Sequence, residues 1–388
     1  MMLFGRGYRP FFLLASTYAV LFVPLWVCVV LGTIAAPAWV STTAWHAHEM
    51  LFGFCTAAIA GFLLTSVPVW TGTTAVAGGA LAALAGLWIA GRVAMLALAG
   101  SVPGLAAAVD LAFLPLLALA IGPPILRAGI RRNFGFPVGI LALFAANALV
   151  HAEALGLATG TAAIGLRAGV DLVALLVVVI GGRVAPSFTT NALRRLGIAQ
   201  IASPPPWAER AAVPAFLAFL VMDLVLPASL ASGIVALAAA IVLAARMSGW
   251  RTARVLGDPL LWSLHLGHAW VVVGLACIAA SDLAGAWPRS VAVHALTAGA
   301  FGTMILAMMT RVALGHSGRP LVAPRSAVIA YTLVTLGALV RTIAVAAFPV
   351  ETLPMIATGG LLWAGAFAAY LVGYASMLTT PRVDGRPG

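Results

Sequence analysis

Apolar runs long enough to cross a lipid bilayer occupy most of the chain, and short polar or proline-rich stretches separate them. A spanning helix needs roughly 20 apolar residues, and counting such runs gives about twelve. Because a spanning helix satisfies its own backbone hydrogen bonds, we predict an all-α polytopic membrane helix bundle that forms one integral membrane domain over residues 1–388. The predicted spans are 11–35, 45–69, 74–99, 104–126, 134–155, 161–185, 210–227, 228–246, 259–280, 289–312, 323–347 and 352–378.

The seventh and eighth predicted spans are joined at Pro227 with almost no loop. They therefore form either a tight hairpin or a pair in which one member re-enters the membrane. Elsewhere, proline and glycine mark the ends of the runs, as at Ser203-Pro204-Pro205-Pro206.

The composition supports lipid as the solvent of this chain. Hydrophobic residues make up 63% of the 388 positions and charged residues only 8%, which is more apolar surface than a soluble protein of this length can bury. The net charge is +11, yet the basic residues are all arginines placed in short clusters between apolar runs. That placement is typical of membrane topology, so no nucleic-acid partner is expected.

The arginines also predict the orientation. They gather at every second loop, and by the positive-inside rule this makes both termini cytoplasmic. The opposite loops carry little beyond Arg167 and Arg289. The arginines on the predicted cytoplasmic side are Arg6, Arg9, Arg127, Arg131, Arg132, Arg194, Arg195, Arg251, Arg254, Arg319, Arg325, Arg382 and Arg386.

Seven histidines lie in this chain, and six of them fall within or at the ends of apolar segments; His316 lies in a polar loop. An ionisable side chain inside the membrane is costly, so each such residue is a functional hypothesis with a partner to be found. Imidazole is also a common ligand of copper and haem iron. The topology places four of them in the outer half of the bundle: His46, His48, His151 and His294.

The segment Trp45-His46-Ala47-His48-Glu49 has two interpretations. Residues two apart on an α-helix point in nearly opposite directions, so His46 and His48 are expected to have different partners unless the segment is extended. We interpret both as metal or haem ligands, and the alternative is a polar helix start at the membrane interface.

Three further groups are candidate sites. His265 and His268 share a helix face and are interpreted either as a copper site or as interhelical hydrogen-bonding residues. His294 is followed by Gly299 and Gly302, whose small size lets either a flat macrocycle or a neighbouring helix approach closely; tight helix packing explains the glycines but not His294. Arg183 and Arg311, each followed by Val-Ala, are candidate ligands of propionate or phosphate oxygens, with topological anchoring as the alternative.

Acidic residues from several spans fall in the outer half with the histidines. Glu49, Arg92 and Asp110 are the candidate catalytic residues, because Arg92 and Asp110 lie at similar depth on consecutive spans. Together with Glu49 and Asp110, the carboxylates of Glu153 and Asp171 are candidates for a proton path. Asp223 lies at a similar depth. Groups of this kind are expected to face the interior of the bundle.

A weak internal periodicity accompanies these motifs. Aligning His48 with His294 also aligns Gly72 with Gly318, 24 residues later in both cases. The second, sixth and tenth spans occupy equivalent positions in three four-helix blocks, a layout that resembles haem–copper oxidase subunits. The sixth span has no histidine, so this likeness concerns the layout alone.

The motifs together resemble the NnrS family of bacterial inner-membrane proteins. The matching stretches are Gly7-Tyr8-Arg9-Pro10-Phe11-Phe12, Trp45-His46-Ala47-His48-Glu49-Met50-Leu51-Phe52-Gly53-Phe54, Gly61-Phe62-Leu63-Leu64-Thr65, Gly182-Arg183, Leu260-Leu261-Trp262-Ser263-Leu264-His265, His294-Ala295-Leu296-Thr297 and Leu314-Gly315-His316-Ser317-Gly318-Arg319. The resemblance implies a role in nitric oxide response and denitrification, with haem and copper as cofactors. It implies metal-ligand roles for His46, His48, His265, His294 and His316.

The expected protein is therefore a multi-pass haem b and copper protein of the bacterial inner (cytoplasmic) membrane that acts on nitric oxide or limits its damage. The preferred haem ligands are His294 and one of His46 or His48, with Arg92 beside a propionate. Nitric oxide reduction would also need an electron donor. The alternatives are a secondary transporter of metals or anions, and a haem-based sensor without turnover.

Overall fold

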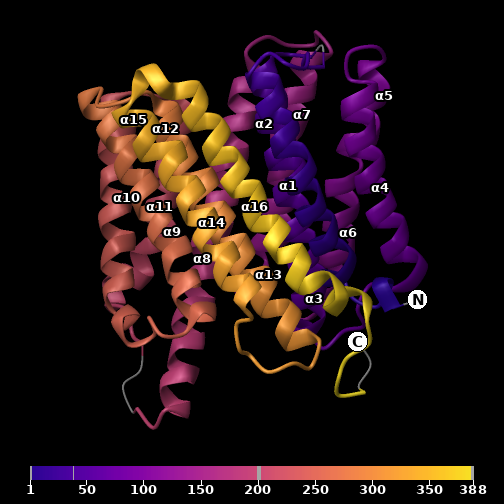
Figure 1. Ribbon diagram of the computed structural model, residues 1–388, viewed down its shortest axis with the longest axis vertical. Helices are drawn as coiled ribbons and strands as arrows, with labels where there is room; N and C mark the ends of the chain where they lie inside the picture. The colour runs from indigo at the N-terminus through magenta and orange to yellow at the C-terminus, as the bar shows by residue number, and fades with distance from the viewer. Residues whose placement is uncertain (1, 38, 199–201, 386–388) are drawn as a thin grey trace. The chain divides into compact units, whose positions relative to one another are not determined.

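The computed structural model describes residues 2–37, 39–198 and 202–385, and these residues form helices and no strand (Figure 1). The prediction of an all-α bundle is therefore confirmed. Within the described part, eleven helical stretches are long and apolar enough to cross a membrane. The chain is thus a multi-pass membrane protein.

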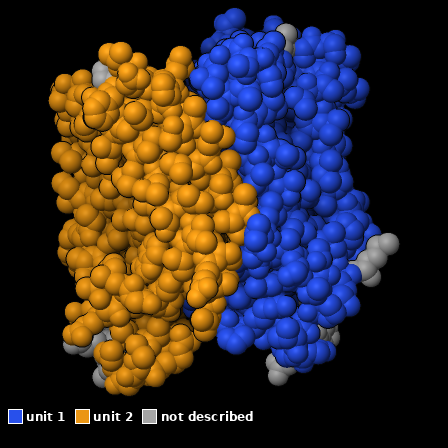
Figure 2. Space-filling model, viewed as in Figure 1, with its two compact units in different colours: residues 1–172, 311–321, 371–388 blue, residues 173–310, 322–370 orange. Residues whose placement is uncertain are grey.

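Contacts between helices divide the chain into two compact units (Figure 2). Unit 1 contains residues 1–172, 311–321 and 371–388, and unit 2 contains residues 173–310 and 322–370. Each unit is described by itself below. The arrangement in three four-helix blocks stays a prediction.

Unit 1 is built from the first five spans. The second and fourth of them are composite: a π-helical turn interrupts the second, and Ala112 separates two α-helices in the fourth. The elements are α1 Tyr8–Val30, α2 Thr42–His48, η2 Glu49–Cys55, α3 Thr56–Thr71, α4 Gly78–Ala97, α5 Pro103–Leu111, α6 Phe113–Arg127 and α7 Gly135–Ala154, followed by the first part of α8 Thr161–Arg195. α1 packs on α3, α4 on α5, and α6 on α7.

Unit 2 begins within α8, which continues about ten residues beyond the span predicted to end at residue 185. Its central pairs are α10 with α11 and α11 with the π-helical segment η5. The elements are α9 Pro206–Val225, α10 Leu230–Ser248, α11 Pro259–Ala284, α12 Arg289–His294, η5 Ala295–Phe301, α13 Gly302–His316, α14 Arg325–Leu339, η6 Val340–Ala344, α15 Val345–Ala347 and α16 Thr352–Thr379. The last part of α13 and of α16 belongs to unit 1.

The seventh and eighth predicted spans form a hairpin. α9 packs against α10, and Ser229 begins α10 by accepting a hydrogen bond from the Ser232 backbone at 3.1 Å. α9 is the one predicted span outside the eleven apolar stretches, since it carries Glu209, Arg210 and Asp223.

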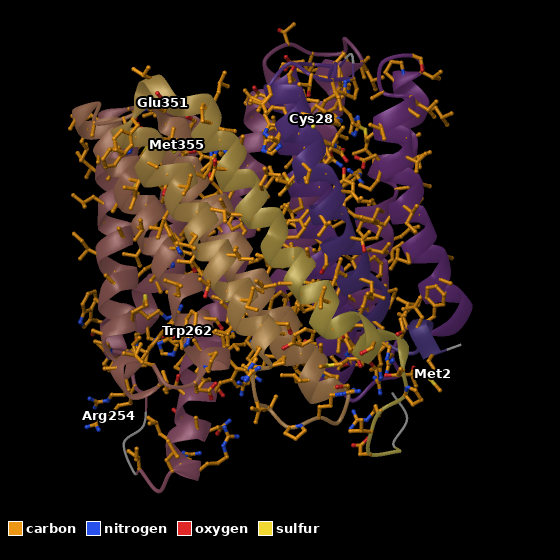
Figure 3. The ribbon with its side chains drawn as sticks, viewed as in Figure 1. Met2, Cys28, Arg254, Trp262, Glu351 and Met355 are labelled. Atoms are coloured by element: carbon orange, nitrogen blue, oxygen red, sulfur yellow. The ribbon has the colours of Figure 1, made fainter. Side chains whose placement is uncertain are left out.

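The beginning of α1 and the end of α16 contact each other in unit 1, near the marked chain ends (Figure 1). The guanidinium of Arg9 donates to the carbonyl oxygens of Leu378 and Thr380, at 3.1 and 2.6 Å. In unit 2, Arg254 and Glu351 lie at opposite ends (Figure 3). Both facts agree with the arginine-based topology, in which the termini share one side and the loop before the last span lies on the other.

Two π-helical segments repeat one pattern. η2 begins immediately after His48 and η5 immediately after His294, and each contains seven residues. The spans that contain them end at Gly72 and Gly318, both in the left-handed conformation with φ of 67° and 75°. The periodicity that aligned His48 with His294 therefore has a counterpart in local backbone structure.

Candidate metal centre

Seven polar side chains meet inside unit 1, among helices that are otherwise apolar. We call this group the His48 cluster. Six of its members are buried and Tyr18 is half-buried. The members are Tyr18, His48, Glu49, Arg92, Asp110, Asn147 and His151.

The start of the π-helical turn positions two of these side chains. His48 is the last residue of α2 and Glu49 the first of η2, so both come from the point where the helix changes its hydrogen-bonding pattern. Such turns are frequent at functional sites. Gly53, within η2, lets two neighbours approach: a Cβ there would lie 3.0 Å from the Tyr18 ring and 3.2 Å from Arg92 Nη1.

Three other helices supply the remaining members. Asn147 and His151 are four residues apart on α7 and therefore share one face. Asp110 comes from the end of α5 and Arg92 from α4. Trp39 closes one side, with its ring centroid 4.9 Å from that of His48 and 5.7 Å from that of His151.

Arg92 holds both carboxylates of the cluster. It donates from Nη1 to Glu49 Oε1 at 2.7 Å and from Nη2 to Asp110 Oδ1. Tyr18 donates its hydroxyl hydrogen to Glu49 Oε2. Arg92 and Asp110, which the sequence places at similar membrane depth, thus form an ion pair. The three candidate catalytic residues, Glu49, Arg92 and Asp110, lie together.

His48 Nε2 faces two oxygen atoms. His48 Nδ1 lies 2.8 Å from Glu49 Oε1, and in the neutral tautomer with its hydrogen on Nδ1 the ring donates to that carboxylate. Its Nε2 then presents a lone pair at 2.9 Å from Asn147 Oδ1 and 3.2 Å from Asp110 Oδ2. Asp110 Oδ2 also accepts a hydrogen bond from Asn147 Nδ2 at 2.7 Å, whereas the Nε2 lone pair of His48 and Asn147 Oδ1 face each other and are stabilised by a proton or a cation between them.

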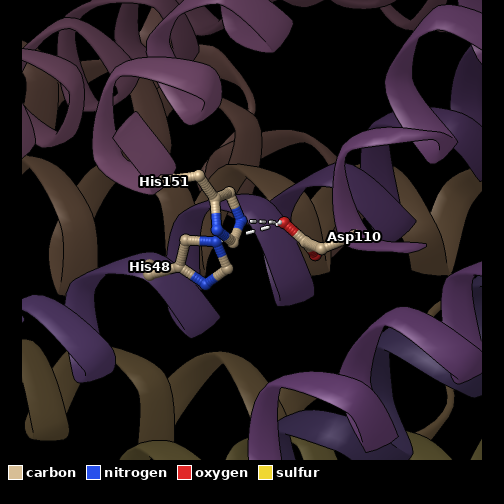
Figure 4. Close-up of side chains that lie close together, drawn as sticks. All are labelled: His48, Asp110 and His151. Carbon is tan, nitrogen blue, oxygen red and sulfur yellow. Dashed lines mark hydrogen bonds and ion pairs between the residues drawn. The ribbon is translucent and has the colours of Figure 1, made fainter. Parts of the chain in front are cut away.

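One ligand atom each from His48, Asp110 and His151 lie within 4.8 Å of one another (Figure 4). His151 Nε2 is 2.9 Å from Asp110 Oδ2. Ligand atoms about 2.0–2.2 Å from a metal ion lie about 3–3.5 Å from each other, and the two nitrogen–Asp110 Oδ2 distances, 3.2 Å from His48 and 2.9 Å from His151, are close to that spacing. Two imidazoles and a carboxylate suit copper, iron or zinc.

The charges of the cluster also favour a cation. Glu49 and Asp110 carry two negative charges, and Arg92 supplies one positive charge. Because these groups are almost fully buried, the remaining negative charge is costly unless a protonated histidine or a metal ion offsets it. The donor set, the spacing and the charge therefore fit a metal ion at His48, Asp110 and His151.

His46 has surroundings different from those of His48, as the helical spacing predicted. Its ring stacks on Trp26, with centroids 4.2 Å apart, and lies parallel to Phe22 at 6.1 Å. The pairing of His46 or His48 with His294 on a haem stays a prediction.

His265 and His268, in unit 2, differ from each other. Both ring nitrogens of His265 are bonded to threonine hydroxyls, at 2.8 Å to Thr189 and 2.8 Å to Thr252. His268 is fully buried beside Trp250, and neither of its ring nitrogens has a hydrogen-bond partner. His265 thus has the environment expected of an interhelical hydrogen-bonding residue. Both ring nitrogens of His268, by contrast, could bind a metal ion.

His294 is the last residue of α12. Its Nδ1–H donates to the Ser290 carbonyl oxygen at 2.7 Å, so Nδ1 has no lone pair for a metal ion. This bond selects the tautomer in which Nε2 carries the lone pair, as in many metal-ligating histidines. Arg341, from η6, is close enough to His294 to interact with it electrostatically.

The remaining predicted residues are spread over both units. Arg311 is buried in unit 1, and Arg183 is exposed on α8. His316 is the last residue of α13 and not a loop residue, which corrects the sequence prediction; the helix continues because Gly318 provides its left-handed end. Its ring packs on Tyr8 at 5.7 Å.

The acidic residues outside the His48 cluster have separate roles. Glu153 accepts a hydrogen bond from the Ala162 backbone at 2.7 Å, and Asp171 is buried on α8. Asp223 pairs with Arg289 in unit 2. A proton path through Glu153 and Asp171 stays a prediction.

His151, Asn147 and Tyr18 are the cluster members that were absent from the predicted site. The sequence carries a signal for the first two, since Asn147 and His151 are four residues apart in an apolar span and must face the same neighbour. Tyr18 has no such signal, because a lone tyrosine in a span is compatible with many positions.

The comparison with protein-family models agrees with the motifs. A comparison with curated proteins found no match. The family model described as NnrS protein matches residues 2–382, nearly the whole chain. The chain belongs to the NnrS family.

Proposed function

We propose that this protein binds copper at His48, Asp110 and His151 and acts in nitric oxide metabolism, or in relief of nitric oxide stress, in the bacterial cytoplasmic membrane. Family membership supports the link to nitric oxide. The convergence of two imidazoles and a carboxylate in a buried, net-negative cluster is the observation that carries the metal site.

A haem b group is the second proposed cofactor, and His294 would hold it by binding its iron. The Ser290 carbonyl holds the His294 ring so that Nε2 is the ligand atom, and Arg341 is an additional cation for a propionate. Nitric oxide is small and apolar, so it can reach either site through lipid.

Copper, when bound, supplies a one-electron centre that can also bind nitric oxide. The chain's own residues prepare that position. Arg92 pairs with Asp110 and fixes the position of its carboxylate, and Glu49 fixes the His48 ring by accepting a hydrogen from Nδ1, so that Nε2 would be the ligand atom. Tyr18 and Glu49 together hold a proton next to the site.

Metal analysis of the purified protein tests this assignment. The His151→Ala variant is expected to lose copper, whereas the Trp39→Phe variant, which changes packing against the same ring without removing a ligand atom, is expected to keep it. Copper retained in full by His151→Ala would overturn the site.

Nitric oxide consumption by the reduced protein separates the functional classes. Consumption supports an oxidoreductase. Binding to the haem without consumption supports a sensor, and a protein that lacks both haem and copper supports the transporter alternative.

A further inference from the structure

A pocket of about 380 Å³ lies in unit 1 between α1, the second span and α4. Pockets of this size hold small organic molecules. Its lining is mostly apolar; the polar lining residues are Thr17 and the hydrogen-bonded group Tyr18, Glu49 and Arg92. The pocket therefore borders the His48 cluster but is separate from the three proposed metal ligands.

The rim of the pocket consists of exposed apolar side chains on membrane-spanning helices. Leu21 of α1 and Ile89, Val93 and Leu96 of α4 line the pocket and are exposed. Exposed apolar residues on a spanning helix meet lipid, so a molecule dissolved in the bilayer can enter here. A water-soluble metabolite would have to cross hydrocarbon first.

Aromatic side chains form the inner walls. The Phe22 ring stacks on Tyr18, with centroids 5.2 Å apart, and meets the edge of Trp45 at 4.9 Å. Trp88 lies against Tyr18 at 5.5 Å. Walls of this kind favour a flat ring as occupant.

Two hydrogen-bond donors on pocket-lining residues are unused. Arg92 Nε and Trp45 Nε1 are buried, and neither has a hydrogen-bond partner. A buried donor without a partner is costly, so a ligand whose acceptor oxygen reaches one of these two groups gains a hydrogen bond there. Arg92 is already shared by Glu49 and Asp110, so an anionic head such as a fatty-acid carboxylate finds no unpaired cation on this residue.

We propose that this pocket binds a lipid-soluble quinone. The quinone ring fits between the aromatic walls, a carbonyl oxygen accepts from Arg92 Nε or Trp45 Nε1, and the isoprenoid tail leaves over the apolar rim into the bilayer. The proposal concerns binding and is independent of the copper and haem assignments.

Photolabelling of the protein in phosphatidylcholine nanodiscs tests the site. An azido derivative of decylubiquinone is expected to label peptides from α1 and α4 in a saturable manner. Unlabelled decylubiquinone should displace it, whereas decanoic acid should not. Labelling that does not saturate, or that decanoic acid displaces equally well, would mean that the groove takes any acyl chain and would overturn the proposal.

Two variants locate the site. Thr17 lines the pocket and is exposed, so Thr17→Trp should block entry without disturbing the core, and labelling should fall at least tenfold. Leu119→Trp, at an exposed position of α6 outside the pocket, is the control and should label normally. Equal labelling of both variants would contradict the site.

Removal of a donor gives an independent measurement. Trp45→Phe keeps the aromatic wall but loses Nε1, and the affinity for decylubiquinone should fall about three- to tenfold. Thr17→Trp should lose quinone labelling but keep its copper. A wrong quinone site therefore shows as unchanged labelling in this variant, whereas a wrong metal site shows only in the copper content of His151→Ala.

Discussion

Arg92 of α4 forms an ion pair with Asp110 of α5, inside a cluster where two carboxylates share this one arginine. Asp110 turns its other oxygen toward His48 and His151. The arginine thus holds in place the carboxylate that the metal proposal requires, and the first predictions concern this relationship.

Replacement of Arg92 should destabilise the protein. Arg92→Met leaves Glu49 and Asp110 buried without a cationic partner, and the loss of one member of a buried pair costs about 3–5 kcal/mol. The free energy of unfolding, measured in detergent on metal-free protein, is expected to fall by that amount. A loss below about 1 kcal/mol would show that the pair is not buried as described.

A second substitution should partly restore the stability. In the Arg92→Met, Asp110→Asn double variant the cluster again carries one net negative charge, as in the natural chain. Its stability should therefore exceed that of Arg92→Met alone. Copper binding should be absent because the double variant lacks the carboxylate of Asp110, one of the three proposed ligands. Strictly additive losses would mean that the two residues do not interact.

His294→Ala should abolish the haem absorption band of the purified protein. The ring nitrogen Nε2 of His294 is the proposed axial ligand, and alanine has no replacement for it. The visible spectrum of the reduced protein is the measurement. The Ser290→Ala variant is the control, because the backbone carbonyl that holds the ring remains; a full band in His294→Ala would eliminate the assignment.

Gly299→Ala should disturb the second π-helical segment. A Cβ at Gly299 would lie 2.5 Å from the Trp270 ring, and overpacking of this kind costs about 1–3 kcal/mol. Gly86, within α4, has open space around it, so Gly86→Ala should be neutral or stabilising by up to about 1 kcal/mol. Thermal unfolding in detergent compares the two, and equal shifts would contradict the close packing.

His268→Leu separates a structural residue from a metal ligand. Both ring nitrogens of His268 are buried without partners, so removing them should stabilise metal-free protein by about 1–3 kcal/mol. If His268 binds copper, the same variant loses that copper. Unchanged stability together with unchanged metal content would rule out both descriptions.

The positions of the spans could be predicted from the sequence because lipid imposes one strong rule. Runs of about 20 apolar residues have to be helices in a bilayer, and every predicted span corresponds to a helix in the structure. The pairing of Arg92 with Asp110 could be predicted for the same reason. The two residues lie on consecutive antiparallel spans at the same depth in the membrane.

The rest of the site depends on rotation about helix axes, which depth does not determine. His151 was predicted at the right level, yet its contact with Asp110 follows from how α7 turns its Asn147 face toward α5. The contrast between His265 and His268 depends on the positions of Thr189 and Thr252, which lie 76 and 13 residues away from His265 along the chain. No local pattern encodes either arrangement.

The π-helical turns after His48 and His294 change the phase of their helices. A π turn takes one more residue than an α turn, and each residue corresponds to about 100° of rotation. A helical wheel drawn through residues 42–71 or 289–316 as ideal α-helix therefore assigns the later residues to the wrong side. The extra residue of the π turn follows His48 and His294 at the same distance. When cysteine pairs are designed to cross-link either span to a neighbour, positions after the π turn should therefore be shifted by about one residue from those that an ideal α-helix gives.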